Sequence, residues 1–196
     1  MTKIFIGLPT MSYVHTLLTS ALIGWFTSKK YSIEIFFTIN EQPVDNARNK
    51  IVEKFLQSDS THLLFIDSDT IPPENCIEKM LESNKDVISG LTPMIRLAKD
   101  THDFYREWNC VDLEGKFLKP DTGIVPIAGC GASCLMIKRK VFDMPKPYFR
   151  NTYSDDTGKE TFIGEDIYFL TKAKKYGYKC YADTSIICYH SKENIW

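Results

Sequence analysis

The sequence lacks an excess of charge of either sign. Its 24 lysine and arginine residues are balanced by 25 aspartate and glutamate residues, which leaves a formal net charge of −1. A protein that binds DNA or RNA through the phosphates carries a basic surface that releases counterions from the nucleic acid. Because this sequence offers no broad basic field, we expect no nucleic-acid partner.

The sequence also lacks a long hydrophobic run. The longest apolar stretch near the N-terminus covers residues 17–26 and is interrupted by Thr19 and Ser20. A membrane-spanning helix needs about 20 predominantly apolar residues. The first residues lead into no apolar segment that ends in a small-residue cleavage site, so a secretory signal is not expected. We expect no membrane span and a cytosolic protein.

A third absence concerns cysteine spacing, because the sequence contains no CxxC pair. The six cysteines are Cys76, Cys110, Cys130, Cys134, Cys180 and Cys188. In a chain of this size they do not form the pattern of a disulfide framework, and we expect reduced thiols that pack as small hydrophobic side chains. A zinc site built from Cys130, Cys134, Cys188 and His190 is an alternative, although its spacing matches no standard pattern of zinc ligands.

The composition is sufficient for one folded domain over residues 1–196. Hydrophobic residues make up 43% of the chain and aromatic residues 13%, which can bury a core at this length. The first half alternates apolar runs with segments of helical periodicity. This pattern predicts strands at 3–8, 33–39, 62–66 and 86–89, and helices at 14–25, at 45–56 with Asp45 or Asn46 as the cap, and from Pro72-Pro73 to residue 81. Such alternation predicts an α/β fold with a parallel sheet.

The second half has a different character. Residues 92–126 are polar, aromatic and rich in turn residues, with a hairpin turn expected at 112–115. This composition predicts short antiparallel strands. Residues 132–137 are expected to form a core strand, residues 165–176 a helix that ends at Gly177, and residues 179–190 a final extended segment.

Two carboxylates follow the third predicted strand directly, in the sequence Asp67-Ser68-Asp69. In open α/β sheets, ligands bind beyond the carboxyl ends of the strands. Carboxylate oxygens at that edge suit a hard divalent cation, which commonly takes its other ligands from substrate phosphates. Such a metal would neutralise the charge that develops on a departing diphosphate.

The segment Leu64-Phe65-Ile66-Asp67-Ser68-Asp69 resembles the DxD motif of the GT-A glycosyltransferases. Residues 45–49 resemble the helix start that faces the nucleotide in small viral and bacterial members of that superfamily. Residues 129–133 resemble the glycine-rich turn beneath the donor sugar, and residues 164–166 resemble the acidic pair that opens the acceptor-side helix. Together these segments resemble the small glycosyltransferase domains that chlorella viruses use on their capsid protein.

The resemblance implies a single-domain, Rossmann-like GT-A fold. Its central sheet would be mainly parallel and flanked by helices, with a smaller antiparallel sheet on the acceptor side. Residues 1–91 would bind the nucleotide sugar, and residues 92–196 would form the acceptor-side half. The implied activity is the metal-dependent transfer of a sugar from a nucleotide-diphosphate sugar, by family default a UDP-sugar, to a glycan or glycoprotein. A viral capsid glycan in the host cytoplasm would be one such acceptor, and Mn²⁺ or Mg²⁺ would be the cofactor.

The resemblance also assigns residues to the donor site. Arg48, near a helix start, could hold a phosphate or the edge of the uracil ring. Gly129 and Gly131 would let the backbone approach a sugar closely. The full set for the nucleotide sugar is Pro9, Thr10, Asp45, Arg48, Asp67, Ser68, Gly129, Gly131 and Lys192, and the set for the metal is Asp67, Asp69 and His190.

Two acidic residues are the catalytic candidates. Asp166 would act as the general base that accepts the proton of the acceptor hydroxyl, and Glu165 would position the acceptor. Acidic residues are also favoured at a helix start by the helix dipole alone. If the enzyme retains the anomeric configuration, Asp166 would only orient the acceptor.

Two other functions are alternatives. An apolar strand followed by DxD also marks the haloacid-dehalogenase-like phosphatases, but those proteins carry Thr two places after the second Asp, where this chain has Ile71. The second alternative is a non-catalytic carbohydrate-binding or capsid-assembly module on the same fold.

Overall fold

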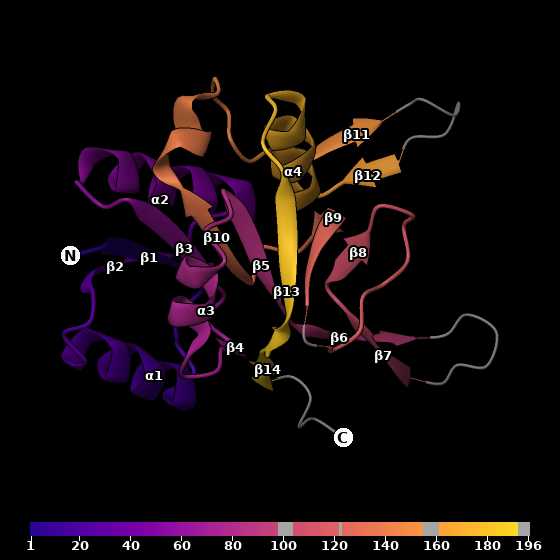
Figure 1. The fold of residues 1–196 in the computed structure, drawn as a ribbon. Coiled ribbons are helices and arrows are strands. Elements are labelled where there is room, and N and C mark those ends of the chain that lie inside the picture. Colours follow the sequence, from indigo (N-terminus) through magenta and orange to yellow (C-terminus); the bar gives the residue numbers. More distant parts are fainter. Residues whose placement is uncertain (98–103, 122, 155–160, 192–196) are drawn as a thin grey trace.

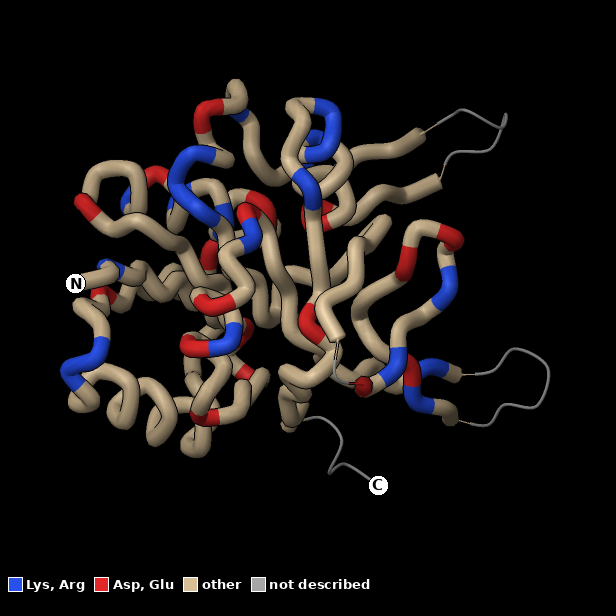
Figure 2. Tube along the Cα trace, viewed as in Figure 1, with Lys and Arg blue, Asp and Glu red and all other residues tan. Residues whose placement is uncertain are grey.

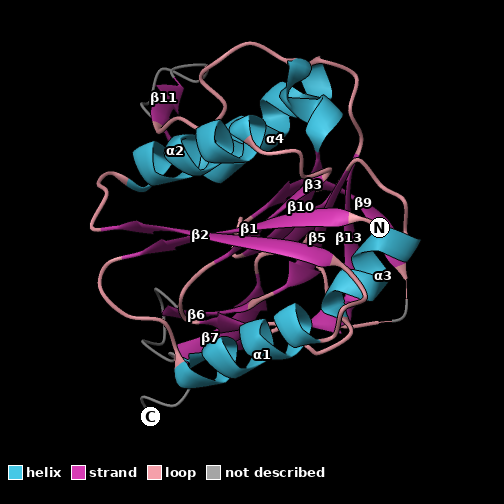
Figure 3. Ribbon diagram, turned by 90° about the vertical axis from the view of Figure 1, so that its left-hand side faces the viewer, coloured by secondary structure: helices cyan, strands magenta, loops and turns pink. Residues whose placement is uncertain are grey.

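The computed structural model describes residues 1–97, 104–121, 123–154 and 161–191. A central sheet lies between two layers of helices. Figure 3 shows α2 (Val44–Gln57) and α4 (Glu165–Lys175) on one face of the sheet, and α1 (Thr16–Thr27) and α3 (Cys76–Glu82) on the other. Lysine, arginine, aspartate and glutamate residues are interspersed along the chain (Figure 2).

Eight strands form the central sheet, in the order β2-β1-β3-β10-β5-β13-β9-β8 (Figure 1). Their bounds are β1 (Lys3–Thr10), β2 (Ser32–Ile39), β3 (His62–Ile66), β5 (Val87–Leu91), β8 (Cys110–Asp112), β9 (Ile124–Cys130), β10 (Cys134–Lys138) and β13 (Cys180–Ile187). A short 3₁₀ helix, Arg139–Asp143, follows β10.

The sheet is mixed, which corrects the expectation of a mainly parallel sheet. Three of its seven neighbouring pairs are parallel, namely β1–β2, β1–β3 and β5–β13, and the other four are antiparallel. The difference arises because β10 returns from the second half of the chain and inserts antiparallel between β3 and β5. Hydrophobic periodicity identifies such a strand but does not give its direction.

Three two-stranded sheets complete the structure. They are β6 (Pro93–Leu97) with β7 (Phe104–Trp108), β11 (Thr152–Ser154) with β12 (Thr161–Ile163), and β4 (Thr70–Ile71) with β14 (Tyr189–His190). The antiparallel strands expected in residues 92–126 are therefore present. The hairpin turn also lies where it was expected, because Gly115 has a positive φ of 82° and its N–H donates to the carbonyl of Asp112.

Three predicted helix starts differ from the structure. Helix α1 begins at Thr16 and not at residue 14. Helix α2 begins at Val44 after Pro43, which takes the capping position without a side-chain hydrogen bond, so neither Asp45 nor Asn46 caps it. Helix α3 begins only at Cys76, because residues 73–76 form a separate turn in which the N–H of Cys76 donates to the carbonyl of Pro73. Helix α4 begins at Glu165 as predicted and is followed by Gly177 with φ of 88°.

The core consists of two apolar layers, one on each face of the sheet. Helices α2 and α4 contribute to the first layer, and helices α1 and α3 to the second. All six cysteines are buried and free. Cys130 belongs to the first layer, whereas Cys134 and Cys188 belong to the second. The alternative zinc set is thus divided between the two faces of the sheet.

No helix among the described residues is both long enough and apolar enough to cross a membrane.

Candidate functional site

A cavity of about 530 Å³ lies beyond the carboxyl ends of β1 and β3. The segment that follows β3 forms one wall, the start of α2 a second, and the start of α4 a third. The complete lining is Pro9, Thr10, Met11, Glu41, Gln42, Val44, Ala47, Arg48, Asp67, Ser68, Asp69, Thr92, Pro93, Met94, Asn109, Gly131, Ala132, Ser133, Glu165, Asp166 and His190. Segments that are far apart in the sequence therefore meet at one edge of the sheet.

Most of the residues predicted for the site line this cavity. They are Pro9, Thr10, Arg48, Asp67, Ser68, Asp69, Gly131, Glu165, Asp166 and His190. Asp45 and Gly129 are not among the lining residues. Lys192, predicted to reach the diphosphate, lies outside the described residues.

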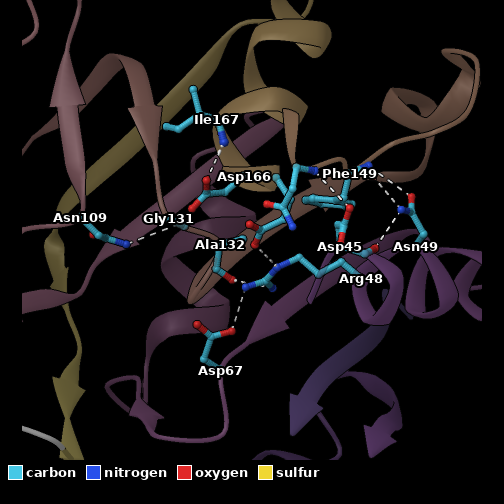
Figure 4. A network of polar contacts seen from close by, with 12 residues as sticks. Asp45, Arg48, Asn49, Asp67, Asn109, Gly131, Ala132, Phe149, Asp166 and Ile167 are labelled. Atoms are coloured by element: carbon cyan, nitrogen blue, oxygen red, sulfur yellow. Dashed lines mark hydrogen bonds and ion pairs between the residues drawn. The ribbon is translucent and has the colours of Figure 1, made fainter. Parts of the chain in front are cut away.

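Arg48 lies at the centre of the polar contacts in the site (Figure 4). Its Nε donates to Oε1 of Glu165 at 3.0 Å, and its Nη2 donates to Oδ1 of Asp67 at 3.0 Å. Its Nη1 also donates to the carbonyl of Ala132 at 3.4 Å, and the guanidinium carbon lies 5.3 Å from the centre of the Phe65 ring. Arg48 therefore joins α2 to the end of β3 and to the start of α4.

The environment of Arg48 keeps the guanidinium charged. The residue is only 4% exposed. Burial by itself lowers the pKa of Arg48, but the negative charges of Asp67 and Glu165 outweigh this effect, and the pKa is raised. Because the donors are directed at two carboxylates and a carbonyl, the arrangement is that of a buried ion-pair bridge. Direct contact between Arg48 and a nucleotide stays a prediction.

The acidic motif after β3 sends its two carboxylates in different directions. The N–H of Thr70 donates to the carbonyl of Asp67, which closes a tight turn. Asp67 points to Arg48, whereas Oδ2 of Asp69 lies 3.4 Å from Nε2 of His190. The pairing of β4 with β14, in which Thr70 opposes His190, brings this histidine to Asp69.

The three predicted metal ligands are thus arranged as a pair, Asp69 with His190, and a separate Asp67. Within residues 1–97, 104–121, 123–154 and 161–191, no three His, Cys, Asp or Glu side chains form a group that could hold a metal ion.

Asp166 occupies the first turn of α4, where its Oδ1 accepts a hydrogen bond from the N–H of Ile167 at 2.7 Å. A Cβ atom placed on Gly164 would lie 2.9 Å from that oxygen, so the absence of a side chain at Gly164 leaves room for the carboxylate. Burial, and then the charge of Glu165, raise the pKa of Asp166 to about 6. This carboxylate is ionised at neutral pH and is more basic than an ordinary aspartate.

The cavity carries an excess of negative charge. Among its described lining residues, the five carboxylates of Glu41, Asp67, Asp69, Glu165 and Asp166 outnumber one permanent positive charge, that of Arg48. A diphosphate would be repelled by this field. A cation that accompanies the diphosphate would remove the repulsion, because a bound metal ion is often the largest local charge in a site.

The sequence does not predict Asn109 and Thr92 as lining residues of the cavity, whereas Ser133 lies within the predicted segment 129–133. Oδ1 of Asn109 accepts from the N–H of Thr92 at 2.8 Å, and its Nδ2 donates to Oγ of Ser133 at 3.2 Å. The hydroxyl of Ser133 in turn donates to that of Thr92 at 2.8 Å. These bonds hold the segment that contains Gly131 against Thr92, the residue between β5 and β6. A single asparagine in a polar, turn-rich segment carries no sequence signal that would distinguish it.

Asp45 and Gly129, predicted to contact the donor, have other neighbours. Oδ2 of Asp45 accepts from the N–H of Asn151 at 3.1 Å, and Asn49, one turn later in α2, accepts from the N–H of Phe149. This side of α2 therefore holds the segment that leads to β11. A Cβ atom on Gly129 would lie 2.8 Å from Cδ1 of Ile167, so the glycine allows α4 to pack closely against β9.

No protein-family model matches the sequence, and no curated protein matches it either. The fold is similar to that of A197 from STIV. The match covers 97% of this chain and 85% of A197, with 22% identity and a TM-score of 0.64.

A second structural match is a crystal structure of GalNAc-T7 with UDP, GalNAc and Mn²⁺. It covers 96% of this chain but 43% of the GalNAc-T7 chain, with 11% identity and a TM-score of 0.53. At these identities, both matches show that the fold is shared and nothing further.

The bridge made by Arg48 predicts a large loss of stability when its cation is removed. Arg48→Ala would leave the buried Glu165 carboxylate without a partner, and we expect the free energy of unfolding to fall by about 3–5 kcal/mol. Arg96→Ala is a matched control, because Arg96 also pairs with a glutamate at 3.0 Å but its side chain is 50% exposed. The control should lose about 0–1 kcal/mol. Urea unfolding measures both, and equal losses would contradict the bridge.

The raised pKa of Asp166 predicts a dependence of stability on pH. The folded protein holds the Asp166 proton up to about pH 6, whereas the unfolded chain releases it near 3.8, the ordinary pKa of aspartate. The stability that this proton provides is therefore present below about pH 4 and is lost as the pH rises through 6. Asp166→Asn should be more stable than the parent protein at pH 7.5, by at most about 3 kcal/mol, and this difference should disappear at pH 4. Equal stability at pH 7.5 would contradict the raised pKa.

Proposed function

We propose that this protein is a glycosyltransferase that moves a sugar from a nucleotide-diphosphate sugar, preferably a UDP-sugar, to a glycan or glycoprotein acceptor. The observation that carries the proposal is the composition of one cavity. It brings the Asp69–His190 pair together with Asp166, a carboxylate suited to act as a base, at the edge of the sheet where α/β proteins bind ligands. The GalNAc-T7 structure, which has this fold, contains UDP, GalNAc and Mn²⁺.

In this proposal, Asp69 and His190 hold a divalent cation, Mn²⁺ or Mg²⁺. Their atoms Oδ2 and Nε2 are 3.4 Å apart at the cavity wall. One or two protein ligands supplemented by phosphate oxygens and water are a common ligand set for Mg²⁺ at phosphate sites. The negative field of the cavity supports the same requirement, because it makes the binding of a diphosphate depend on a cation. When bound, the ion would stabilise the charge of the departing diphosphate.

Asp166 accepts the proton of the acceptor hydroxyl in the proposed reaction. The hydroxyl oxygen forms the new bond to the anomeric carbon as the bond from that carbon to the diphosphate breaks, and the diphosphate leaves with the electron pair. Because the pKa of Asp166 is raised to about 6, the group is both ionised and basic at neutral pH. A Cβ atom at Gly131 would lie 3.7 Å from Oδ2 of Asp166, so the missing side chain keeps the space beside the base open.

Because the donors of Arg48 are directed at Glu165, Asp67 and the carbonyl of Ala132, this proposal makes Arg48 a positioning residue, in place of the nucleotide contact predicted from the sequence. By holding Glu165, Arg48 fixes the first turn of α4, which carries Asp166. By holding Asp67, it fixes the start of the segment that carries Asp69.

The ion pair between Arg48 and Asp67 weakens the case for a phosphatase. In the haloacid-dehalogenase pattern the first aspartate of the motif would have to be a free nucleophile, whereas Asp67 is bonded to Arg48.

Measurement of nucleotide-sugar turnover tests the proposal. We expect the protein to hydrolyse or transfer sugars from a panel of UDP- and GDP-sugars when MnCl₂ is present. Addition of EDTA, which removes the metal, should stop this turnover.

Asp69→Ala should abolish the metal-dependent affinity for UDP. Asp166→Asn should lower kcat by about 10²–10⁴-fold with UDP affinity unchanged, because it removes only the base. In the parent protein, kcat should fall below a pH of about 6, where Asp166 becomes protonated.

Glu114→Gln is the matched control, because this glutamate is 72% exposed and lies in the turn after β8. This variant should leave turnover and UDP affinity unchanged.

Hydrolysis of p-nitrophenyl phosphate without turnover of any nucleotide sugar would contradict the proposal and would assign a phosphatase activity to the protein. An unchanged UDP affinity in Asp69→Ala would reject the metal site. Normal turnover in Asp166→Asn would reject the base, and the anomeric configuration of the product would then show whether the enzyme retains it.

A further inference from the structure

The hairpin of β11 and β12 carries two exposed aromatic side chains that the proposed reaction does not use. Tyr153 and Phe162 are paired directly across the two strands, so their side chains lie on the same face of the hairpin. Their ring centroids are 5.6 Å apart and the rings meet edge to face, at 67°. Tyr153 is 65% exposed and Phe162 59%, and neither belongs to a core layer. A paired aromatic surface left open to solvent indicates a binding surface.

This hairpin lies beside α4 (Figure 1). On one side, β11 follows Asn151, whose N–H is held by Asp45 in the first turn of α2. On the other side, β12 leads directly to Gly164, the residue before α4. Tyr153 and Phe162 each lie two residues from these anchor points, and two residues of extended chain span at most about 7 Å. The aromatic pair is therefore held close to the starts of both helices that border the cavity.

The surroundings indicate the kind of molecule that would bind. The face of an aromatic ring is electron-rich and attracts the weakly positive C–H groups on one face of a pyranose ring. The neighbouring cavity wall carries the carboxylates of Glu165 and Asp166, which would repel an anionic ligand. A neutral sugar satisfies both conditions.

We propose that Tyr153 and Phe162 form a platform on which a neutral pyranose unit of an oligosaccharide stacks, beside the wall of the cavity that carries Asp166. That this oligosaccharide is the acceptor rests on the proposed function. A sugar stacked there would lie at the outer end of the cavity, and the next units of the chain would extend towards Asp166. The platform would thereby select for an acceptor longer than a single sugar.

A purely structural role is the competing explanation. Aromatic pairs across antiparallel strands stabilise a hairpin by about 0.2–1 kcal/mol. The double variant Tyr153→Val, Phe162→Val separates the two roles, because valine is also favoured in strands but has no aromatic face. Tyr176→Val is the matched control, since Tyr176 is 50% exposed but lies at the opposite end of α4.

The test is saturation-transfer NMR with cellotetraose, maltotetraose, chitotetraose and mannotetraose as probes, on the full chain. We expect at least one tetrasaccharide to receive saturation on the C–H protons of one ring and to shift the aromatic signals of Tyr153. The Kd should rise at least tenfold in the double variant and stay unchanged in Tyr176→Val. An unchanged Kd in a folded double variant would overturn the platform, and so would the failure of all four probes to bind.

Turnover of UDP-sugars in the same variants distinguishes failure of the platform from failure of the proposed function. Hydrolysis of the donor without acceptor should be equal in the parent protein and the double variant. Normal hydrolysis together with absent tetrasaccharide binding would reject the platform alone. Tetrasaccharide binding that depends on Tyr153 and Phe162, in a protein that turns over no nucleotide sugar, would keep the platform as a sugar-binding site and reject the transferase.

Discussion

The constraint on which the site depends is the burial of a single cation. The guanidinium of Arg48 is surrounded by protein and must be paired, because an isolated buried charge costs several kcal/mol. Its two partners, Asp67 and Glu165, are 19 and 117 residues away in the sequence. By satisfying this one requirement, the fold brings the end of β3 and the start of α4 to the same cavity. The motif at 67–69 and the candidate base are therefore positioned by a common interaction.

The bridge also accounts for the balance of charge around Asp166. Burial is the largest cause of the raised pKa of Asp166, Glu165 raises this pKa further and Arg48 lowers it, so the two members of the ion pair act on Asp166 in opposite directions. The net result is a pKa of about 6 for Asp166. A base with these properties needs a fixed helix start, and Gly164 leaves the room that its carboxylate requires.

Chemical content, and not size, favours this cavity over a larger one. A cavity of about 790 Å³ lies between α1 and α3, on the other face of the sheet. Two acidic residues line this larger cavity. The carboxylate of Glu78 is paired with Lys30 at the surface, and the backbone carbonyl of Glu74 accepts a hydrogen bond from the indole N–H of Trp25. The smaller cavity instead gathers five carboxylates and a histidine beyond the ends of parallel strands.

Local features of the sequence predicted much of the fold, and non-local ones could not be obtained from it. The first three strands, the turn at 112–115 and the start of α4 follow from periodicity and turn chemistry, which act within a few residues. The antiparallel insertion of β10 and the partners of Arg48 depend on contacts between distant segments. For the same reason, the motif at 67–69 located the edge of the cavity but did not show that Asp67 and Asp69 point to different partners.

A crystal structure of the protein with UDP and MnCl₂ tests the central claim most directly. The account predicts the diphosphate in the 530 Å³ cavity, with a manganese ion between it and the Asp69–His190 pair. It also predicts that Arg48 still holds both Asp67 and Glu165. UDP in the cavity between α1 and α3, or a diphosphate bound directly by an Arg48 that has left Glu165, would contradict it.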